Sequence, residues 1–492
     1  MAAKLARIAA GAKAWQHGAT QAKSAFCKQG AAMSFITRRK ALELAAPAHG
    51  LKKSLGWPHL VALGVGAIIG TGIYTLTGVA AGLAGPAVII SFAVAGLVCA
   101  CAALCYAEMA SLTPQAGSAY TYSYVALGEG VAWIIGWALI LEYTLVCSAV
   151  SVGWSGYASG LIRDAGWGVP DALLAGGLID VPAIFIALVV TGVLLAGTHE
   201  SATVNFVLVI VKLVALAAFV ALTLPAFDAA NFEPFAPFGF GAHEVDGHKV
   251  GVMGAAAIIF FAFYGFDAIS TAAEEAKDPK RDLTIGIVGS MAICTLIYMV
   301  VAAAALGAVP FDLFSKSPEP LAFVLRELGQ PGAAAVIAGA AVVAMPTVIM
   351  VFMFGQSRVF FAMARDGLLP RRLAAIDRRG VPVAVTVLTG VMSAIIAGVM
   401  PLDEIAALAN AGTLAAFIAT ACAVMVLRRR APDLERPFAT PLVWVVAPAA
   451  VAGCLYLFTS LSAKTIVFFF VWSAIGVAAY LAYGRSRSAL AG

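Results

Sequence analysis

Long apolar segments recur along almost the whole of this 492-residue chain, and they leave it few possible folds. Only 12% of the residues are charged, against roughly a quarter in soluble proteins. Within a membrane every backbone polar group must find a partner inside the protein, which favours helices for such segments. The sequence therefore predicts an all-α polytopic membrane protein. We expect twelve transmembrane helices, numbered here as spans 1 to 12, at residues 58–83, 86–112, 130–158, 181–198, 201–224, 250–275, 284–308, 331–363, 382–400, 404–427, 442–461 and 465–483.

Basic residues are distributed unevenly between the segments that connect these spans. With the N-terminus in the cytoplasm, 25 of the 31 Lys and Arg residues fall on the inner side and five on the outer side. Cytoplasmic segments typically hold the excess of positive charge, so the asymmetry predicts an even number of spans and two cytoplasmic termini. The net charge of +5 then reflects topology, and binding to nucleic acid need not be invoked.

The spans fall into two halves, with a tail at each end of the chain and an outer loop between the halves. The N-terminal tail is basic and cytoplasmic, and it is expected to lie on anionic membrane lipid. A short outer helix is expected at 318–328, where proline and glutamate favour a helix start. The predicted divisions are the tail at 1–56, repeat 1 at 57–224, an outer loop covering the outer surface at 225–249, repeat 2 at 250–427, spans 11 and 12 at 428–484, and a cytoplasmic C-terminal tail at 485–492.

Span 1 contains Gly64-Val-Gly66-Ala-Ile-Ile-Gly70-Thr-Gly72, with four glycines in nine residues. Each glycine costs a helix interior roughly 1 kcal/mol relative to alanine. Non-helical backbone is tolerated inside a membrane only where it lines a cavity or contacts protein. We expect the helix to break here and its freed N–H and C=O groups to bind a small polar solute at mid-membrane. The alternative is an unbroken helix in which Gly66 and Gly70 permit a close helix crossing.

A second candidate break lies in span 6, where aromatic residues surround a lone glycine in Phe261-Ala-Phe-Tyr-Gly-Phe-Asp267. It follows the first candidate break by five spans. Interrupted helices at corresponding positions of two halves indicate an inverted-repeat transporter. The expected fold is therefore a 5+5 inverted repeat with broken helices 1 and 6 plus two extra helices. For span 6 taken alone, a bulky packing face on an unbroken helix is the alternative.

Three ionisable residues fall within predicted spans, where charge is costly and marks a functional site by default. Glu108, near the inner end of span 2, either pairs in an inner gate or contacts the substrate. Glu142, in the middle of span 3, either holds the cationic end of a substrate or acts as a hydrogen-bonded strut between helices. Lys212, well inside span 5, is either a proton carrier or fixed cation, or it reaches out to the membrane surface. Its central position favours the coupling role.

Cysteine and histidine patterns give no indication of a metal centre. Seven of the eight cysteines lie within apolar segments, where they serve as small apolar residues. The sequence contains no CxxC pair, HExxH motif or GxSxG elbow. We therefore expect no metal ion, no cofactor and no enzymatic activity.

Several motifs are joined in this chain over about residues 50–485. They are the glycine sequence of span 1, the span 6 motif, Tyr106-Ala-Glu-Met109, Pro114-Gln-Ala-Gly-Ser-Ala-Tyr-Thr-Tyr122, Glu274-Glu-Ala-Lys-Asp-Pro279 and Arg358-Val-Phe-Phe-Ala-Met-Ala-Arg-Asp-Gly-Leu-Leu-Pro370. Together they resemble the amino acid–polyamine–organocation superfamily, and within it the bacterial form of the cationic amino acid transporter family. The resemblance implies a secondary transporter of L-amino acids in the bacterial inner membrane. It leaves an accessory subunit open.

The resemblance also implies roles for individual residues. An α-carboxylate would be bound at the helix break of span 1, by backbone N–H groups of Ile69, Gly70, Thr71 and Gly72. The α-ammonium would meet the carbonyl of Ile68 and the span 6 break, which consists of Phe261, Ala262, Phe263, Tyr264 and Gly265. Lys212 matches the lysine that occupies the place of a sodium ion in sodium-coupled relatives, which implies proton coupling. Met345 would shape the side-chain pocket and favour smaller substrates, with Glu142 available for a cationic end.

The expected function is thus alternating-access transport, coupled to protons, of small neutral amino acids such as alanine, of cationic arginine and lysine, or of both. Two alternatives remain. An exchanger of amino acids or polyamines would need a counter-substrate for efflux. A transporter-like amino acid sensor would bind its ligand without moving it.

Overall fold

The computed structural model describes residues 37–41, 55–113, 115, 117–197, 202–245, 248–271, 276–375, 377 and 381–490. Most of the predicted tail at 1–56 lies outside this part of the chain. So do Pro114 and Glu274 of the two loop motifs.

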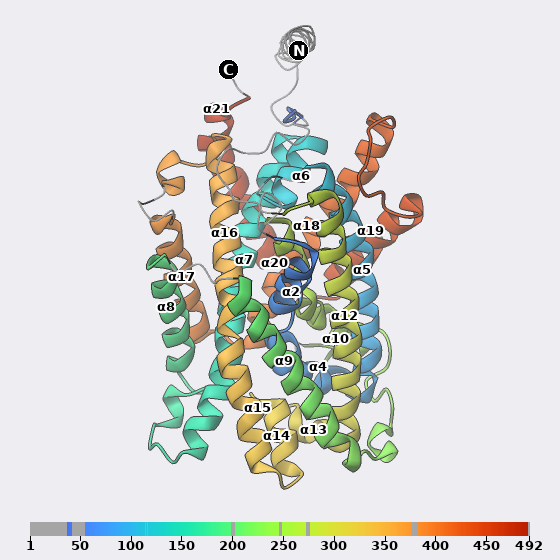
Figure 1. The fold of residues 1–492 in the computed structure, drawn as a ribbon, viewed down its shortest axis with the longest axis vertical. Coiled ribbons are helices and arrows are strands. Elements are labelled where there is room, and N and C mark those ends of the chain that lie inside the picture. The colour runs from blue at the N-terminus through green and yellow to red at the C-terminus, as the bar shows by residue number, and fades with distance from the viewer. Residues whose placement is uncertain are drawn as a thin grey trace, which may run out of the picture.

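The described chain is mostly helical, and the long helices run roughly along the long axis of the molecule (Figure 1). The helices of the first half are α2 (Trp57–Ile68), α3 (Thr71–Tyr74), α4 (Leu76–Ala84), α5 (Val88–Leu112), α6 (Ala119–Ala126), α7 (Glu129–Asp164), α8 (Val181–Leu195) and α9 (Ala202–Thr223). Those of the second half are α10 (Val252–Ile259), α11 (Phe266–Thr271), α12 (Pro279–Ala308), α13 (Phe311–Phe314), α14 (Pro320–Glu327), α15 (Pro331–Ala344), α16 (Pro346–Arg365), α17 (Val383–Val399) and α18 (Leu402–Arg430). The chain ends with α19 (Val443–Thr459), α20 (Ala463–Ala479) and α21 (Arg485–Arg487).

Short elements connect these helices. They are η1 (Gly85–Ala87), η2 (Asp171–Leu173), η3 (Leu224–Ala226), η4 (Ala229–Phe232), η5 (Phe260–Phe263), η7 (Arg371–Ala374), the π-helical η8 (Tyr480–Gly484), and the strands β1 (His243–Val245) and β2 (His248–Val250). The antiparallel pair β1–β2 departs from the all-α expectation for the outer loop. Its physical reason is in the sequence, because Asp-Gly between two strands is a strong signal for a two-residue hairpin turn.

Hydrophobic length agrees with the predicted membrane location. In the described part of the chain, seven helices are long and apolar enough to cross a membrane by length and composition, and five shorter apolar helices accompany them. Each of the twelve predicted spans contains helix, and α14 forms within the short helix predicted at 318–328. Its location on the outer side stays a prediction. The protein is a multi-pass helical membrane protein.

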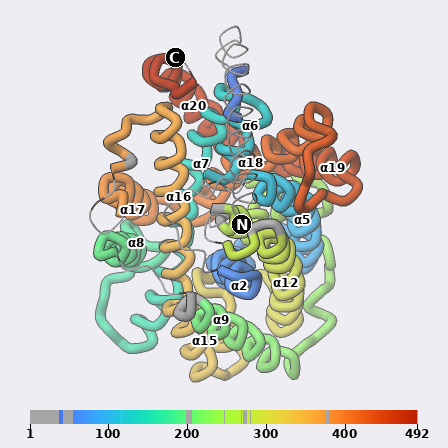
Figure 2. Tube along the Cα trace, turned by 45° about the horizontal axis from the view of Figure 1, so that its top comes forward, coloured from blue at the N-terminus to red at the C-terminus, as the bar shows by residue number. Residues whose placement is uncertain are grey.

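Two groups of helices enclose the interrupted helix α2. On one side α12 packs against α2 and α5; on the other, the long helix α7 packs against α16 and α18. Helices α8 and α17 lie side by side at one edge, and α19 packs outside α5 and α18 at another (Figure 2). Helix α2 lies near the middle of the assembly in this view. The span 1 glycines Gly64, Gly66 and Gly72 are buried.

Candidate functional site

The helix of span 1 is interrupted where its glycines predict a break. Helix α2 ends at Ile68, Ile69 is extended, and Gly70 has φ −155° and ψ −140°. Helix α3 then begins at Thr71 and ends at Tyr74, before α4 continues the span. The interruption therefore exposes the start of a new helix, with its positive dipole end, inside the protein.

Span 6 is interrupted in a related way. The tight turn η5 follows α10, Tyr264 is extended, and Gly265 takes a φ of +116° that residues with a Cβ rarely adopt. Helix α11 begins directly afterwards. The turn is held by Asp267, whose Oδ1 accepts the Gly265 N–H at 3.1 Å and whose Oδ2 accepts the Tyr143 hydroxyl at 3.1 Å.

The two breaks lie directly against each other. A Cβ placed on Gly72 would sit 2.4 Å from the Cα of Ala262, and one placed on Gly265 would sit 2.8 Å from the carbonyl carbon of Ala67. Only glycine permits such a close approach of backbone to backbone. The alternative of an unbroken helix with a close crossing at Gly66 and Gly70 is therefore wrong. The close backbone approach occurs instead at Gly72 and Gly265, beside the breaks themselves.

Backbone donors accumulate at this junction. Among the described residues, the N–H groups of Gly70, Thr71 and Gly72 meet no acceptor, and neither does the buried hydroxyl of Thr71. The N–H of Ile69, predicted as a fourth donor, instead donates to the carbonyl oxygen of Val65 at 2.9 Å, because Ile69 caps the end of α2. Buried backbone N–H groups are nearly always paired, so an unpaired set indicates a ligand position. The carbonyl of Ile68 accepts the Tyr298 hydroxyl at 2.6 Å, which leaves one of its two lone pairs for a substrate ammonium.

Lys212 joins this junction to span 8. It is fully buried on α9, and its Nζ donates to the carbonyl oxygen of Gly66 at 2.6 Å and to Oγ1 of Thr347 at 3.2 Å. Lys212 therefore does not reach the membrane surface. Its ammonium ties α9 to the end of α2, just before the break, and to the first turn of α16.

Glu142 and Tyr264 lie in the same buried region but make different contacts. Neither carboxylate oxygen of Glu142 has a hydrogen-bond partner within the described structure, although the residue is fully buried on α7. The Tyr264 hydroxyl donates to Oδ1 of Asn410, whose amide in turn donates to the carbonyl oxygen of Ala257 at 2.6 Å. Both roles expected for Glu142, binding a cationic end and acting as a strut between helices, stay predictions.

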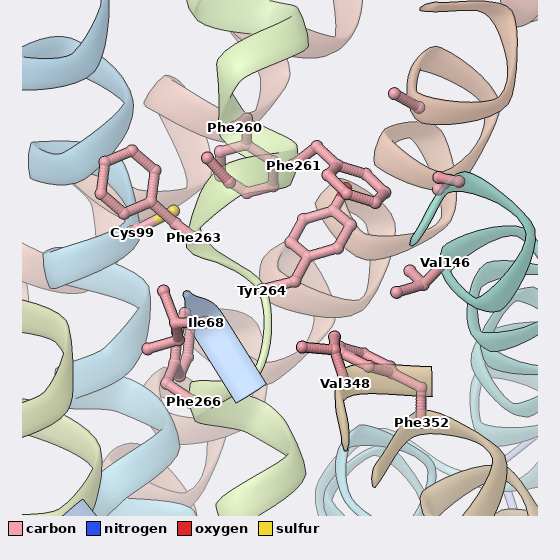
Figure 3. Packing of buried hydrophobic residues seen from close by; sticks show 14 of the residues in the cluster. Ile68, Cys99, Val146, Phe260, Phe261, Phe263, Tyr264, Phe266, Val348 and Phe352 are labelled. Atoms are coloured by element: carbon pink, nitrogen blue, oxygen red, sulfur yellow. The ribbon is translucent and has the colours of Figure 1, made fainter. Parts of the chain in front are cut away.

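Apolar side chains face one another beside the break in span 6. Figure 3 shows Phe261 and Tyr264 opposite Val348 and Phe352 of α16, with Val146 of α7 between them. Val348 supplies the atoms nearest to a Cβ placed on Gly70, the closest at 3.1 Å. Met345, predicted to shape the side-chain pocket, is buried at the junction of α15 and α16, three residues before Val348.

Glu108 holds the end of the bundle that is predicted to be cytoplasmic. Its carboxylate forms a two-bond pair with Arg428 at 2.9 Å and 2.9 Å, and Nε of Arg436 lies 3.2 Å away. The N–H of Thr440 donates to the same carboxylate at 2.8 Å. Helix α5 is thereby fastened to α18 and to the loop that follows it, as the ion-pair alternative expects; the role as a gate stays a prediction.

The opposite end is covered by α14. A Cβ on Gly78 of α4 would sit 3.0 Å from Pro320, and one on Gly156 of α7 would sit 2.4 Å from the carbonyl oxygen of Pro318. Beside them, the buried Glu319 accepts a hydrogen bond from Arg326. Burial raises the pKa of Glu319 to about 7, and the positive charge of Arg326 offsets only part of that rise.

Four further residues organise the site without having been assigned to it from sequence: Asp267, Tyr298, Thr347 and Asn410. Asp267 carried a local signal, since an acidic residue two positions after a glycine is suited to capping a turn. Thr347 follows the Met345-Pro346 step in span 8. Tyr298 and Asn410 are polar residues within largely apolar helices, and only their intramembrane position marked them.

The described residues contain no group of three or more His, Cys, Asp and Glu side chains able to hold a metal ion. The groups that converge on the junction are backbone amides, hydroxyls, the carboxylates of Asp267 and Glu142, and the ammonium of Lys212. Such a set is suited to binding a small zwitterion.

Two interrupted helices that meet inside a multi-pass helical protein define a secondary transporter. The chain belongs to the amino acid permease family, whose sequence pattern matches residues 55–482. This is a family of transporters and not of enzymes.

Individual relatives differ in what they carry. The chain is similar to the branched-chain amino acid permease BcaP of Bacillus subtilis, with 45% identity over 92% of this chain and 99% of the relative. It is similar to the methylthioribose transporter of the same organism, with 39% identity over 93% and 100% of the two chains. Identity to the vacuolar cationic amino acid transporter 2 of Arabidopsis thaliana is 40%, over 83% of this chain and 65% of the relative.

Proposed function

We propose that this protein imports neutral aliphatic L-amino acids across the bacterial inner membrane by proton-coupled alternating access. In this proposal it has twelve spans with both termini in the cytoplasm. The amino acid backbone is bound at the two helix breaks, and the side chain is held between α7, η5 and α16.

The three unpaired N–H groups of Gly70, Thr71 and Gly72 carry the proposal. They stand at the start of α3, where the helix dipole attracts an anion. A hydrogen bond to a charged group is worth about 1.5–3 kcal/mol, so three such groups form a strong receptor for an α-carboxylate. The carbonyl groups of Ile68, at the end of α2, and of Ala262, in η5, are the matching acceptors for an α-ammonium.

The side-chain compartment supports a neutral substrate. Val146, Val348 and Phe352 present only hydrocarbon, which suits a branched aliphatic side chain. The similarity to a permease named for branched-chain amino acids agrees with this choice. Glu142 keeps arginine and lysine as further candidates, because its unpaired carboxylate would attract a cationic end.

Packing between the two halves supports the inverted repeat. If spans 1–5 and 6–10 are equivalent, then α5, α7 and α8 correspond to α12, α16 and α17. Each of these pairs is in direct contact, and the two breaks also adjoin. A two-fold axis running between the halves would bring equivalent helices together in this way.

Lys212 is our candidate for proton coupling. As an ammonium it bridges Gly66 and Thr347, and thereby α2 and α16. As a neutral amine it would hold these two acceptors less strongly, because charge-assisted hydrogen bonds are roughly twice as strong as neutral ones. Loss of the proton would therefore loosen the break of span 1 from span 8, which is the movement that alternating access requires.

Uptake of radiolabelled leucine, alanine and arginine into proteoliposomes tests the proposal. Leucine uptake should rise with an inward proton gradient, and Lys212→Ala should remove that dependence. Lys464→Ala is the matched control, because Lys464 is exposed and, within the described structure, pairs with Glu404 at the surface. Gradient-dependent uptake that survives Lys212→Ala would exclude Lys212 as the coupling residue.

Two competition experiments separate the remaining candidates. Efflux that proceeds only with an external amino acid would identify an exchanger. Methylthioribose is a sugar without a carboxylate, so it should not compete with leucine. Strong competition by this compound would show that the N–H groups of the break are not the main recognition element.

A further inference from the structure

A cavity of about 700 Å³ opens where α16 and the final helices of the chain end. It lies at the end of the bundle that carries α6 and α21 (Figure 1), opposite the end with α13 and α14. One wall is the loop after α16, with Pro370, Arg371 and Arg372. The other wall is the C-terminal segment, with Tyr483 and Arg487.

The cavity concentrates positive charge that the described structure does not neutralise. No carboxylate pairs with Arg371, Arg372 or Arg487 among the described residues. The guanidinium of Arg487 lies over the ring of Tyr483, 5.2 Å from its centroid, and both residues line the cavity. Three arginines that line one cavity repel each other, and an anion between them would relieve that repulsion. Arginine binds phosphate with paired hydrogen bonds.

The two walls are fastened to each other without help from a ligand. The N–H of Ala489 donates to the carbonyl oxygen of Asp366 at 2.9 Å and so joins the two walls. The Ser488 hydroxyl donates to the buried carboxylate of Glu129 at 2.6 Å, which fixes the C-terminal segment to α7. A Cβ on Gly367 would sit 2.2 Å from the carbonyl oxygen of Arg487. The cavity is therefore preorganised, and binding would not have to order either segment.

The C-terminal segment that lines the cavity follows directly on α20, and the surface of α20 is apolar and exposed. Large apolar side chains on α20 and η8 are exposed, among them Phe470, Val471, Ile475 and Leu481. In a membrane protein such a surface contacts acyl chains. Tyr483 separates this apolar surface from the arginines, as aromatic residues do at membrane interfaces. A ligand with a phosphate and two acyl chains would match both parts.

We propose that this cavity binds the phosphate headgroup of an anionic phospholipid, with the acyl chains lying along α20. Arg371, Arg372 and Arg487 hold the phosphate, and the lipid joins the loop after span 8 to the C-terminal segment. A soluble phosphate compound would share the headgroup chemistry but would leave the apolar surface of α20 unused.

Binding of fluorescent phosphatidylglycerol to the full-length protein in detergent tests the site. The variant Arg371→Gln/Arg372→Gln/Arg487→Gln should bind this lipid about a hundredfold less tightly, at about fivefold for each charge removed. Single Arg487→Gln should weaken binding about fivefold and guards against a fold defect in the triple variant. The control is Lys277→Gln/Arg429→Gln/Arg430→Gln, which removes equal charge from the same end of the bundle and should keep the wild-type affinity.

The source of the phosphate is decided by competition. Unlabelled phosphatidylglycerol should displace the probe, whereas phosphatidylcholine and millimolar inorganic phosphate should not. Displacement by inorganic phosphate as effective as that by the lipid would overturn the assignment to a lipid. Unchanged affinity in both the triple and the single variant would overturn the site itself.

Discussion

Replacement of Gly72 by alanine tests the contact between the two helix breaks. The added Cβ would lie 2.4 Å from Cα and 2.5 Å from Cβ of Ala262, whereas ordinary contact begins at 3.4 Å. The breaks must therefore separate by about 1 Å, the difference between 3.4 Å and 2.4 Å. Because one of the opposing atoms belongs to the backbone, no side-chain rotation can relieve the clash.

The expected effect is larger on substrate binding than on folding. Overpacking of this kind costs about 1–3 kcal/mol of stability. A hydrogen bond stretched by about 1 Å from a typical 2.9 Å no longer counts as one. Loss of a single charge-assisted bond from the Gly72 N–H would cost about 1.5–3 kcal/mol, which is about a 10- to 150-fold loss of affinity.

Leucine uptake in proteoliposomes and the melting temperature in detergent measure the two effects separately. Gly192→Ala is the control, since no atom lies within 4 Å of a Cβ at this helical position. It should leave the KM unchanged and stabilise α8 by roughly 0.5–1 kcal/mol. A Gly72→Ala protein that transports leucine with the wild-type KM would refute both the junction and the carboxylate site derived from it.

Two further substitutions test the ends of the bundle. Because burial raises the pKa of Glu319 from 4.5 to about 7, the folded state binds more protons than the unfolded state between these values. The melting temperature should therefore fall as pH rises from 4.5 to 7 and level off above 7; Glu319→Gln should remove much of this fall, and the exposed Glu327→Gln should not. Glu108→Gln should destabilise the protein by about 3 kcal/mol, because it leaves Arg428 without its buried partner. Combining it with Arg428→Gln should cost clearly less than the sum of the single changes, and strict additivity would contradict the ion pair.

Much of the fold was predictable because hydrophobic length and glycine content act locally. Apolar runs gave helices at each predicted span, and the glycines of span 1 gave an interruption at Ile69 and Gly70. The span 6 break was predictable from Gly265, whose φ of +116° is a requirement that a single residue type meets. Each of these features depends on a few consecutive residues, so the sequence displays it directly.

Partners that come from distant segments were not predictable. Tyr298 donates to a carbonyl 230 residues away, and Tyr264 meets Asn410 across 146 residues. Nothing beside Tyr298 or Asn410 in the sequence distinguishes a hydroxyl or amide with such a partner from one without. Likewise, Val348 approaches Gly70 because α16 begins at Pro346. This contact depends on how two distant helices pack, and the composition of either segment does not predict it.

The junction also shows why recognition of the amino acid backbone and recognition of its side chain must occupy different parts of the site. The missing Cβ at Gly72 both permits the approach to Ala262 and leaves the N–H groups of α3 uncovered. Any side chain added there would push the two breaks apart and cover those donors at the same time. Variation at the breaks is therefore costly. Val348 lies against Gly70 and is constrained with the breaks, whereas Phe352, one helical turn further along α16, is free to change size with the substrate. Related permeases with different substrates should accordingly differ on α16 and α7 while sharing the two breaks.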